Sequence, residues 1–430
     1  MQVMQDIVSA HKGGSPVGIY SVCSAHPLVI EASLRHGEAT DSIVLIEATS
    51  NQVNQDGGYT GMRPADFVAR VYAIADKVGF DHKDILFGGD HLGPNCWQHL
   101  DADEAMDRSD VLIDAYVRAG FRKIHLDCSM SCAGDPVPLT DEIVASRAVR
   151  LCKVAEAAWK GVGGEPPVYI IGTEVPVPGG ATEDLDSLAV TSPEAAEATI
   201  YAHKRAFEGA GLAYVWPRVV GLVVQPGVEF DHHKVVDYVP GEAKALSRFI
   251  EQFPTMVFEA HSTDYQNPSA LAALVRDHFA ILKVGPALTY ALRQALLALD
   301  MIEQALVAPG DAANVRQTVL DAMKGNPAHW QKYYAAEGPQ QRLDLEYSYS
   351  DRIRYYWAQP KVEEAVAKLV ASLNASPPPL TMISQYMPEE YRAVREGRIG
   401  NTAEELIIHR IETVLSMYSA ASQAEAMDPA

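Results

Sequence analysis

The stretch Ile85-Leu86-Phe87-Gly88-Gly89-Asp90-His91-Leu92-Gly93-Pro94 runs from an apolar segment directly into an aspartate and a histidine. Its first five residues are typical of a short parallel strand that is buried on both faces. An Asp-His pair on its own is more often a helix cap beside a surface histidine. Here the pair follows the strand, where α/β barrels place their chemistry, so the stretch predicts a buried strand with a functional site at its end.

Seven more runs of this kind occur before residue 290, and helical patterns separate them. One helix start is plain, because Ser192-Pro193-Glu194 combines an N-cap, a proline at the first helical position and an acidic first turn. Eight strand-then-helix units in order predict a closed (β/α)8 TIM barrel rather than an open doubly wound sheet. No G-x-G-x-x-G follows the first run, which argues against a dinucleotide-binding domain. The expected strands span residues 17–22, 43–48, 85–89, 123–127, 168–173, 219–224, 256–260 and 280–284.

The chain changes character after about residue 290. A helical pattern leads to a polar stretch and then to the aromatic and basic run Ser350-Asp351-Arg352-Ile353-Arg354-Tyr355-Tyr356-Trp357. Two more helical patterns follow, with Pro377-Pro378-Pro379 between them. We expect a barrel at residues 1–290 and, at residues 291–430, a helical extension that packs on the barrel and ends in a loose tail.

Composition restricts the partners and the compartment. The 430 residues carry a formal net charge of -21, and nucleic acid needs basic faces, so a nucleic-acid partner is excluded. A small phosphorylated molecule is still possible, because it needs only a few amides and one or two cations. The chain has no signal-like segment, no apolar run of membrane-spanning length and an odd number of cysteines, five. We therefore expect a cytoplasmic protein without a membrane partner.

Polar residues occur at or just past the end of every expected strand. Because those ends meet at one mouth of a barrel, the side chains should converge there. Histidines together with carboxylates and an amide suit a divalent metal, Zn²⁺ first and Mn²⁺, Co²⁺ or Ni²⁺ as alternatives. The polar set comprises Ser24, Glu47, Asn51, Asp90, His91, Asp127, Ser129, Glu174, Gln225, Glu259, His261 and Lys283.

Several of these residues have a second interpretation. His261 is as well explained by a hydrogen-bonded core histidine as by a metal ligand, and Gln225 is equally open. Glu259 and Asp127 can orient ligands instead of binding metal. Lys283 can be a Schiff-base lysine, although a metal site would make that role redundant.

Two further stretches allow a functional and a plain interpretation. His232-His233 looks like a metal tract but lies among polar loop residues, so a solvated loop is favoured. In the run at 350–357, Arg352 or Arg354 can reach over the mouth and clamp a phosphate, or the run can be a core-facing helix with solvated arginines.

Four stretches of this chain resemble the family named for the Z-type, non-catalytic subunit of D-tagatose-1,6-bisphosphate aldolase. The resemblance covers nearly the whole chain. Its members are described as aldolase subunits or tagatose 6-phosphate kinases, and others are 4-epimerases of tagatose, fructose or their 6-phosphates. The four stretches are residues 88–94, Gly172-Thr173-Glu174-Val175-Pro176, Phe258-Glu259-Ala260-His261-Ser262-Thr263-Asp264 and residues 350–357.

The family is also distantly similar to class II aldolases, and that similarity implies roles for single residues. It makes Asp90 the proton carrier and makes His91 and His261 metal ligands. Class II aldolases have a further ligand histidine after strand 6, where this chain has Gln225-Pro226-Gly227. The resemblance thus implies an altered metal site, with Glu174 as third ligand or second base and Gln225 completing the shell.

The hypothesis that follows is a ketose 4-epimerase. Carbon 4 of a 2-ketose is not next to the carbonyl, so breaking and re-forming the C3–C4 bond is the accessible route to inversion. Substrate hydroxyls would meet Ser24, Asn51, Asp127, Ser129, Glu259 or Lys283, and a phosphate would meet Arg352 or Arg354. The alternatives are a non-catalytic subunit that stabilises a class II aldolase, and an aldolase that releases its aldehyde. A kinase is not supported, because no Walker loop is present. A homo-oligomer is also possible.

Overall fold

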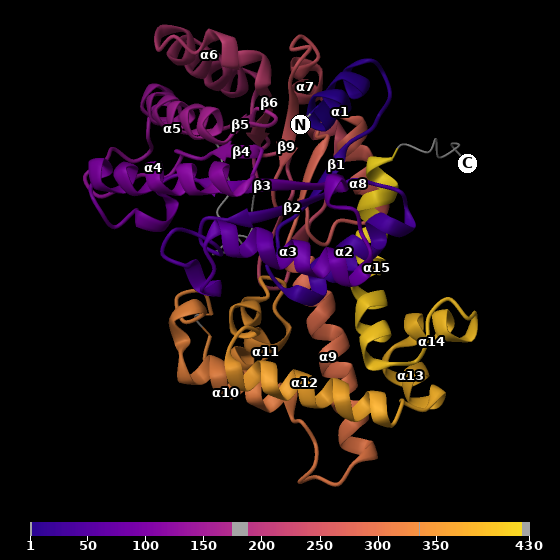
Figure 1. The fold of residues 1–430 in the computed structure, drawn as a ribbon. Coiled ribbons are helices and arrows are strands. Elements are labelled where there is room, and N and C mark those ends of the chain that lie inside the picture. Colours follow the sequence, from indigo (N-terminus) through magenta and orange to yellow (C-terminus); the bar gives the residue numbers. More distant parts are fainter. Residues whose placement is uncertain (1, 174–187, 335, 424–430) are drawn as a thin grey trace.

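The computed structural model describes residues 2–173, 188–334 and 336–423 (Figure 1). Eight parallel strands close into a barrel, in the order β1-β10-β9-β6-β5-β4-β3-β2. The predicted barrel is therefore confirmed, and each expected strand is present. The strands are β1 Ile19–Val22, β2 Val44–Thr49, β3 Ile85–Leu92, β4 Lys123–Leu126, β5 Val168–Ile171, β6 Val219–Val224, β9 Val257–Ala260 and β10 Ile281–Val284.

Helices follow the strands and surround the barrel, as the alternating pattern predicts. The start of α6 is the one that the sequence shows most clearly. Ser192 accepts a hydrogen bond from the backbone N–H of Ala195, and Pro193 is the first helical residue. The helices are α2 Pro27–Ala39, α3 Pro64–Val78, α4 Ala102–Ala119, α5 Asp141–Val162, α6 Pro193–Gly209, α7 Pro240–Ile250 and α8 Pro268–Arg276, with short 3-10 turns η1 Gly58–Thr60, η2 His82–Asp84, η3 Pro94–Trp97 and η4 Ala213–Arg218.

An N-terminal helix, α1 Gln2–Lys12, covers the end of the barrel opposite the strand carboxyl ends. Met4 and Val8 on this helix are buried among inward-facing strand residues such as Ile19 and Val257. That apolar cluster fills the end of the barrel next to α1. The polar side chains described below lie at the other end, where the strands have their carboxyl ends.

The segment after β6 forms a short hairpin, β7 Glu229–Phe230 with β8 Val235–Val236. The favoured solvated loop at His232-His233 is thus only partly correct. Nδ1 of His232 is 3.0 Å from Oγ of Ser350, and its Nε2 is 2.9 Å from the carbonyl oxygen of Tyr333. The hairpin is held against the C-terminal segment by these bonds.

The C-terminal residues form a helical layer over the mouth of the barrel, below it in Figure 1. The last helix, α15 Ala403–Ser422, leaves that layer and lies along the barrel against α2, α8 and β1. The expected region 291–430 thus contributes one helix to the ring around the barrel. The other elements are α9 Pro286–Leu306, α10 Val315–Gly325, η5 Pro327–His329, α11 Gly338–Tyr347, η6 Arg352–Tyr356, α12 Pro360–Ala375, α13 Leu380–Tyr386 and α14 Pro388–Arg395.

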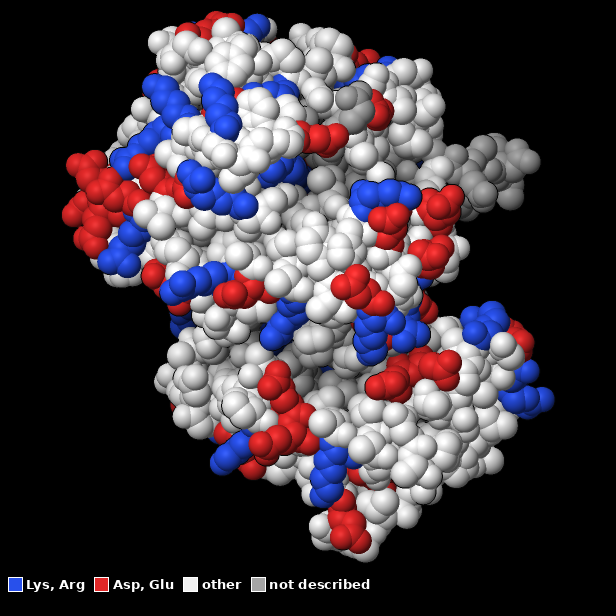
Figure 2. All heavy atoms as spheres, in the orientation of Figure 1, with Lys and Arg blue, Asp and Glu red and all other residues white. Residues whose placement is uncertain are grey.

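The face in Figure 2 carries scattered acidic and basic side chains among uncharged residues, with acidic side chains gathered at its left edge. Within the described ranges, every helix is too short or too polar to pass through a bilayer.

Candidate functional site

The carboxyl end of β3 is irregular at the Asp-His pair. The pairing of β3 with β4 shifts register between Gly89 and Leu92, and His91 has a φ of 48°, in the left-handed region. Side chains of a regular strand alternate between its faces, so Asp90 and His91 could not both face the mouth without such a break. Both residues line the cavity described below. The strained backbone thus serves to bring two neighbouring side chains to one place.

Two glycines of the same stretch give room to neighbouring groups. A Cβ at Gly88 would lie 2.6 Å from Oε1 of Glu47, so the missing side chain leaves space for that carboxylate inside the barrel. A Cβ at Gly93 would lie 1.7 Å from the carbonyl oxygen of Asp127. Gly93 therefore allows the loop after β3 to pass against the end of β4.

His91 is fixed by a carboxylate at the end of the neighbouring strand. Its Nδ1 donates to Oδ2 of Asp127 at 2.7 Å, and its Nε2 lies 3.6 Å from Oδ2 of Asp90. Burial disfavours charge on this ring, but Asp90 and Asp127 outweigh it and raise the pKa of His91. Asp127 also accepts from the backbone and hydroxyl of Ser129, at 3.1 and 2.6 Å. Asp127 and Ser129 therefore support His91 in this structure.

His125 belongs to the site, although it was absent from the predicted set. It is the third residue of β4, and Lys123 and His125 alternate with apolar Ile124 and Leu126. Polar residues at every second position of a buried strand were the available signal, since they place both side chains inside the barrel. Nδ1 of His125 is 3.0 Å from Oδ1 of Asp90.

His261 stands one residue beyond β9 and is oriented by Glu259 on that strand. Its Nε2 lies 2.9 Å from Oε1 of Glu259. Burial lowers the pKa of His261 to about 4 against the opposing effect of Glu259. A histidine that is neutral at pH 7 has an unprotonated nitrogen to offer a metal ion.

The three imidazoles face one another around a small space. The ring centres of His91 and His261 are 5.1 Å apart, and His125 is 5.4 Å from each of them. One ligand atom from each of Asp90, His125, Glu259 and His261 lies within 4.8 Å of the others. Nε2 of His125 is buried, and no hydrogen bond to it exists within the described residues. Imidazole and carboxylate groups with an unpartnered ring nitrogen fit a divalent metal ion.

Lys283 on β10 brings a cation to the same space. Its Nζ lies 3.0 Å from Oδ1 of Asp90 and 3.9 Å from Oε1 of Glu259, and it also contacts Oε2 of Glu47. Burial favours the neutral amine, but Asp90 and Glu47 outweigh it and raise the pKa of Lys283 well above its ordinary value. An ammonium held in ion pairs is not nucleophilic, so this arrangement disfavours a Schiff base.

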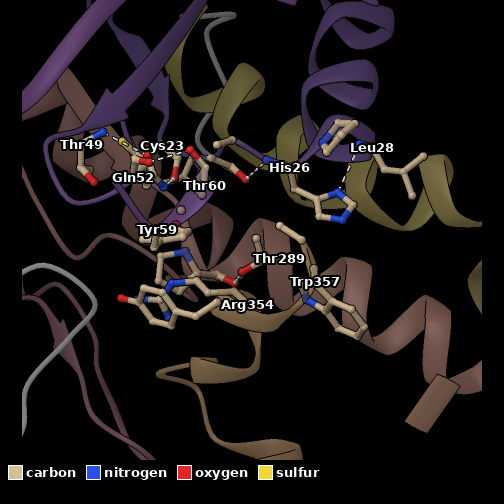
Figure 3. Close-up of a pocket in the computed structure, with 18 of the residues that line it drawn as sticks. Cys23, His26, Leu28, Thr49, Gln52, Tyr59, Thr60, Thr289, Arg354 and Trp357 are labelled. Atoms are coloured by element: carbon tan, nitrogen blue, oxygen red, sulfur yellow. Dashed lines mark hydrogen bonds between the residues drawn. The ribbon is translucent and has the colours of Figure 1, made fainter. Parts of the chain in front are cut away.

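Above these groups lies a cavity of 660 Å³ between the barrel mouth and the C-terminal layer, a size that suits a small metabolite. Asp90, His91, His261 and Lys283 form its floor. Figure 2 shows the hollow between barrel and helical layer from outside. The close-up in Figure 3 shows Tyr59, Thr289 and Arg354 near one another, with Trp357 farther along the wall.

The expected substrate-binding residues fall into three groups. Ser24, Asn51 and Arg354 line the cavity together with Lys283. Asp127 and Glu259 lie behind histidines and orient them, and Ser129 donates to Asp127. Arg352 does not line the cavity, since it stacks 3.4 Å over the ring of Tyr333 and donates to the carbonyl oxygen of His329.

One of the expected ligands, Gln225, does not join the cluster, and another lies outside the part of the chain that the structure describes. Gln225 accepts with its Oε1 from the backbone N–H groups of Gly227 and Val228, at 2.8 and 3.0 Å. Its side chain closes a turn after β6. Glu174 lies outside the described residues.

Arg354 is a half-buried cation and Asp264 a buried anion in the cavity wall. Arg354 donates to the carbonyl oxygens of Ser350 and Asp351 and, at 3.0 Å, to the hydroxyl of Tyr355. Asp264 accepts with Oδ1 from the N–H groups of Gly285 and Ala287, at 2.9 and 2.8 Å, where α9 begins. Burial raises the pKa of Asp264 to about 6, although these bonds and Arg354 oppose the shift. Asp264 is the last residue of the stretch 258–264 that resembles the family, but nothing in the sequence indicated a role for it.

Comparison with known proteins adds the family. A solved structure described as a probable tagatose 6 phosphate kinase from Sinorhizobium meliloti 1021 is 50% identical, with a TM-score of 0.87, and the match covers 94% of this chain and 100% of that one. A fructuronate-tagaturonate epimerase UxaE from Cohnella laeviribosi is 12% identical (TM-score 0.48; 94% and 81% covered). A putative fructose-1,6-biphosphate aldolase from Coccidioides immitis is 13% identical (TM-score 0.43; 86% and 99% covered). The last two likenesses are too distant to support a functional argument.

One family model spans residues 4–423, which is nearly the whole chain. The protein therefore belongs to the family described as D-tagatose-1,6-bisphosphate aldolase subunit GatZ/KbaZ-like.

Proposed function

We propose that this protein is a metal-dependent ketose 4-epimerase that interconverts D-tagatose 6-phosphate and D-fructose 6-phosphate. The observation that carries the proposal is the meeting of three imidazoles beside Asp90 and Lys283, because two of these imidazoles, Asp90 and Lys283 line one cavity. Membership of a tagatose-bisphosphate aldolase subunit family supports the sugar class.

The metal would be held by His91, His125 and His261, with Zn²⁺ as first candidate. Three histidines and one open position are a common catalytic zinc arrangement. When bound, the cation would polarise the C2 carbonyl and offset the negative charge that develops on the enediolate. Asp127 and Glu259 would hold two of the rings in place.

Asp90 is the proposed acid and base. Its carboxylate takes the proton from the C4 hydroxyl, the C3–C4 bonding pair moves into the enediolate, and O4 becomes the oxygen of an aldehyde. The aldehyde then turns its other face, the C3–C4 bond re-forms, and Asp90 returns the proton to O4. Burial opposes the charge of Asp90, but His91 and Lys283 outweigh it and keep the pKa of Asp90 well below its ordinary value. The ionised base is therefore present before substrate binds.

The remaining cavity residues would bind the substrate. Ser24, Asn51 and Lys283 offer hydrogen bonds to sugar hydroxyls, and Arg354 offers a guanidinium to the 6-phosphate. Glu174 is still proposed as a further ligand or second base, although the described structure does not include it. Its assignment rests on the sequence alone.

The second candidate function is a non-catalytic subunit that stabilises a class II aldolase. The family description names an aldolase subunit, which supports this alternative. An idle barrel would have no need to keep three histidines, Asp90 and Lys283 around one cavity. For that reason the epimerase is preferred.

The test uses the purified protein loaded with Zn²⁺, alone, with D-tagatose 6-phosphate and carbon NMR of the products. We expect fructose 6-phosphate to appear, to stop appearing with EDTA and to return with metal. A His261→Ala variant is the matched control and should have lost both metal and turnover. Release of a free triose would indicate an aldolase. No conversion, together with activation of an added class II aldolase subunit, would establish the stabilising role instead.

A further inference from the structure

Lys123 lies inside the barrel beneath the cavity, and its side chain has no exposed surface. Its Nζ is 2.6 Å from Oε1 of Glu47 and 2.6 Å from Oε2 of Glu259. Both carboxylates are fully buried as well. These three residues come from β4, β2 and β9, so one ammonium group joins three walls of the barrel.

Each of the two carboxylates also holds a group that does face the cavity. Oε1 of Glu259 lies 2.9 Å from Nε2 of His261, and Oε2 of Glu47 contacts Nζ of Lys283. Lys123 is therefore the shared support of the proposed ligand His261 and of the cation Lys283. The chain of contacts continues, since Lys283 is 3.0 Å from Oδ1 of Asp90.

Removing one member of such a chain has a large effect. A buried ion pair is stable only while each charge keeps its partners, and the loss of one partner leaves an uncompensated charge in a low dielectric. Lys123 supplies the cation that lies between the buried carboxylates of Glu47 and Glu259. Without this cation, two buried carboxylates would face each other and would turn toward other partners.

We infer that Lys123 is a positioning residue for the proposed site: through Glu259 and Glu47 it sets the places of His261 and Lys283. The inference rests on the proposed metal-dependent function. It assigns a role to a residue that lies below the cavity floor and touches no substrate.

Two effects of deleting the Lys123 charge have opposite signs, and this makes the inference testable. Loss of a nearby cation, by charge alone, would strengthen the binding of a divalent metal ion. Loss of the support under Glu259 would displace His261 and weaken metal binding. Groups that orient metal ligands typically change metal affinity by about 10- to 100-fold when they are removed.

The experiment is a Co²⁺ titration of the apoprotein and its Lys123→Met variant, followed by calorimetry and by the visible absorption of bound Co²⁺. We expect Kd to rise about tenfold or more in Lys123→Met and the visible bands to shift, as expected for a changed ligand geometry. An unchanged or tighter Kd would overturn the inference, because charge alone would then explain the result.

A second variant covers the case in which Lys123→Met does not fold. The double variant Lys123→Met/Glu47→Gln removes one positive and one negative charge, so the net charge of the interior is unchanged. The amide introduced by Glu47→Gln still offers an oxygen to Lys283, whereas Glu259 has lost the closer of its two lysines, Lys123. We expect weaker Co²⁺ binding here too, and affinity within about twofold of the wild type would overturn the inference, because loss of a ligand-orienting group changes affinity by more than that.

Glu156→Gln is the matched control, because it perturbs a buried ion pair that is not linked to the site. Glu156 lies on α5 and pairs with Arg218 at 2.7 Å and with the hydroxyl of Tyr169 at 2.6 Å. Its Co²⁺ affinity should equal that of the wild type. Turnover is measured separately, so a wild type that binds Co²⁺ without epimerising any ketose would overturn the proposed function and still leave the role of Lys123 readable from Kd.

Discussion

Nδ1 of His91 donates to Oδ2 of Asp127 across 2.7 Å, and this bond fixes which ring nitrogen is left for a metal ion. With Nδ1 protonated, Nε2 is the free nitrogen, and it lies on the side of Asp90, at 3.6 Å from that carboxylate. A carboxylate behind a histidine also raises the basicity of the ring. Asp127 is therefore expected to act on metal affinity without binding the metal.

Replacing Asp127 by Asn tests that expectation. The amide can present an N–H to Nδ1, which would favour the wrong tautomer, so the affinity for Zn²⁺ should fall about 10- to 100-fold. Competition with a chromophoric chelator measures it. Ser129→Ala is the control, because it removes a hydroxyl bond to Asp127 but keeps the carboxylate on His91. Equal Zn²⁺ affinity in Asp127→Asn and the wild type would contradict the assigned role.

A second prediction distinguishes His125, which we propose as a metal ligand, from Gln225, the ligand that the sequence suggested after β6. His125→Ala should reduce bound metal to well below one equivalent, because it removes one of the three imidazoles. Gln225→Ala should keep its metal and lose stability instead, by about 1–2 kcal/mol, because two turn N–H groups lose their acceptor. Metal analysis and urea unfolding give the two readouts. The opposite pattern would restore Gln225 as a ligand.

Arg354 should distinguish phosphorylated from unphosphorylated ketoses. Arg354→Lys keeps a positive charge but loses the planar fork that binds phosphate through two hydrogen bonds. We expect KM for D-tagatose 6-phosphate to rise about tenfold, the equivalent of about 1.4 kcal/mol, while KM for D-tagatose stays near its wild-type value. Arg352→Lys serves for comparison, because Arg352 stacks on Tyr333 and does not line the cavity. Equal effects of Arg354→Lys on both substrates would show that the guanidinium does not bind phosphate.

Asp264 should make stability depend on pH in a defined direction. Its pKa is raised by burial from 3.8 to about 6 in the folded protein. Between about pH 4 and pH 6, Asp264 is protonated in the folded state and ionised in the unfolded state. The free energy of unfolding therefore falls as the pH rises through this range. Asp264→Asn keeps an acceptor for Gly285 and Ala287 and removes this dependence.

The variant should therefore gain stability over the wild type on going from pH 4.5 to pH 7.5, by about 2 kcal/mol. Urea unfolding at the two pH values measures the difference. A difference between variant and wild type that is the same at both values would mean that Asp264 titrates normally.

The sequence was sufficient for the barrel because its signals are local. Each strand is a short apolar run and each helix has its own start, as Ser192 and Pro193 show for α6. The placement of α15 could not be predicted in this way. The apolar side chains of α15 could pack on many surfaces, and only the folded chain shows that α9, α2 and α8 provide the surface.

The site was predicted in part for a similar reason. Asp90, His91, His261 and Lys283 stand at strand ends, and topology brings all such residues to one mouth. His125 lies within a strand, and its importance depends on how far its ring reaches across the barrel. Arg354 lines the cavity and Arg352 does not, and this difference depends on the backbone turn of η6. The aromatic and basic composition of the run does not specify that turn.

The place of α15 has a consequence for how the chain is made. Its partners α2, α8 and β1 are synthesised first, yet the groove between them stays open until residues 403–422 arrive. The end of this helix also ties back to the start of the barrel, since the N–H of Gly18 donates to the carbonyl oxygen of Ser422 at 2.8 Å. The strands can pair around the barrel before α15 is made, but the apolar surface that this helix covers stays exposed on a ribosome-bound chain, and a message truncated ahead of residue 403 would leave that surface exposed permanently.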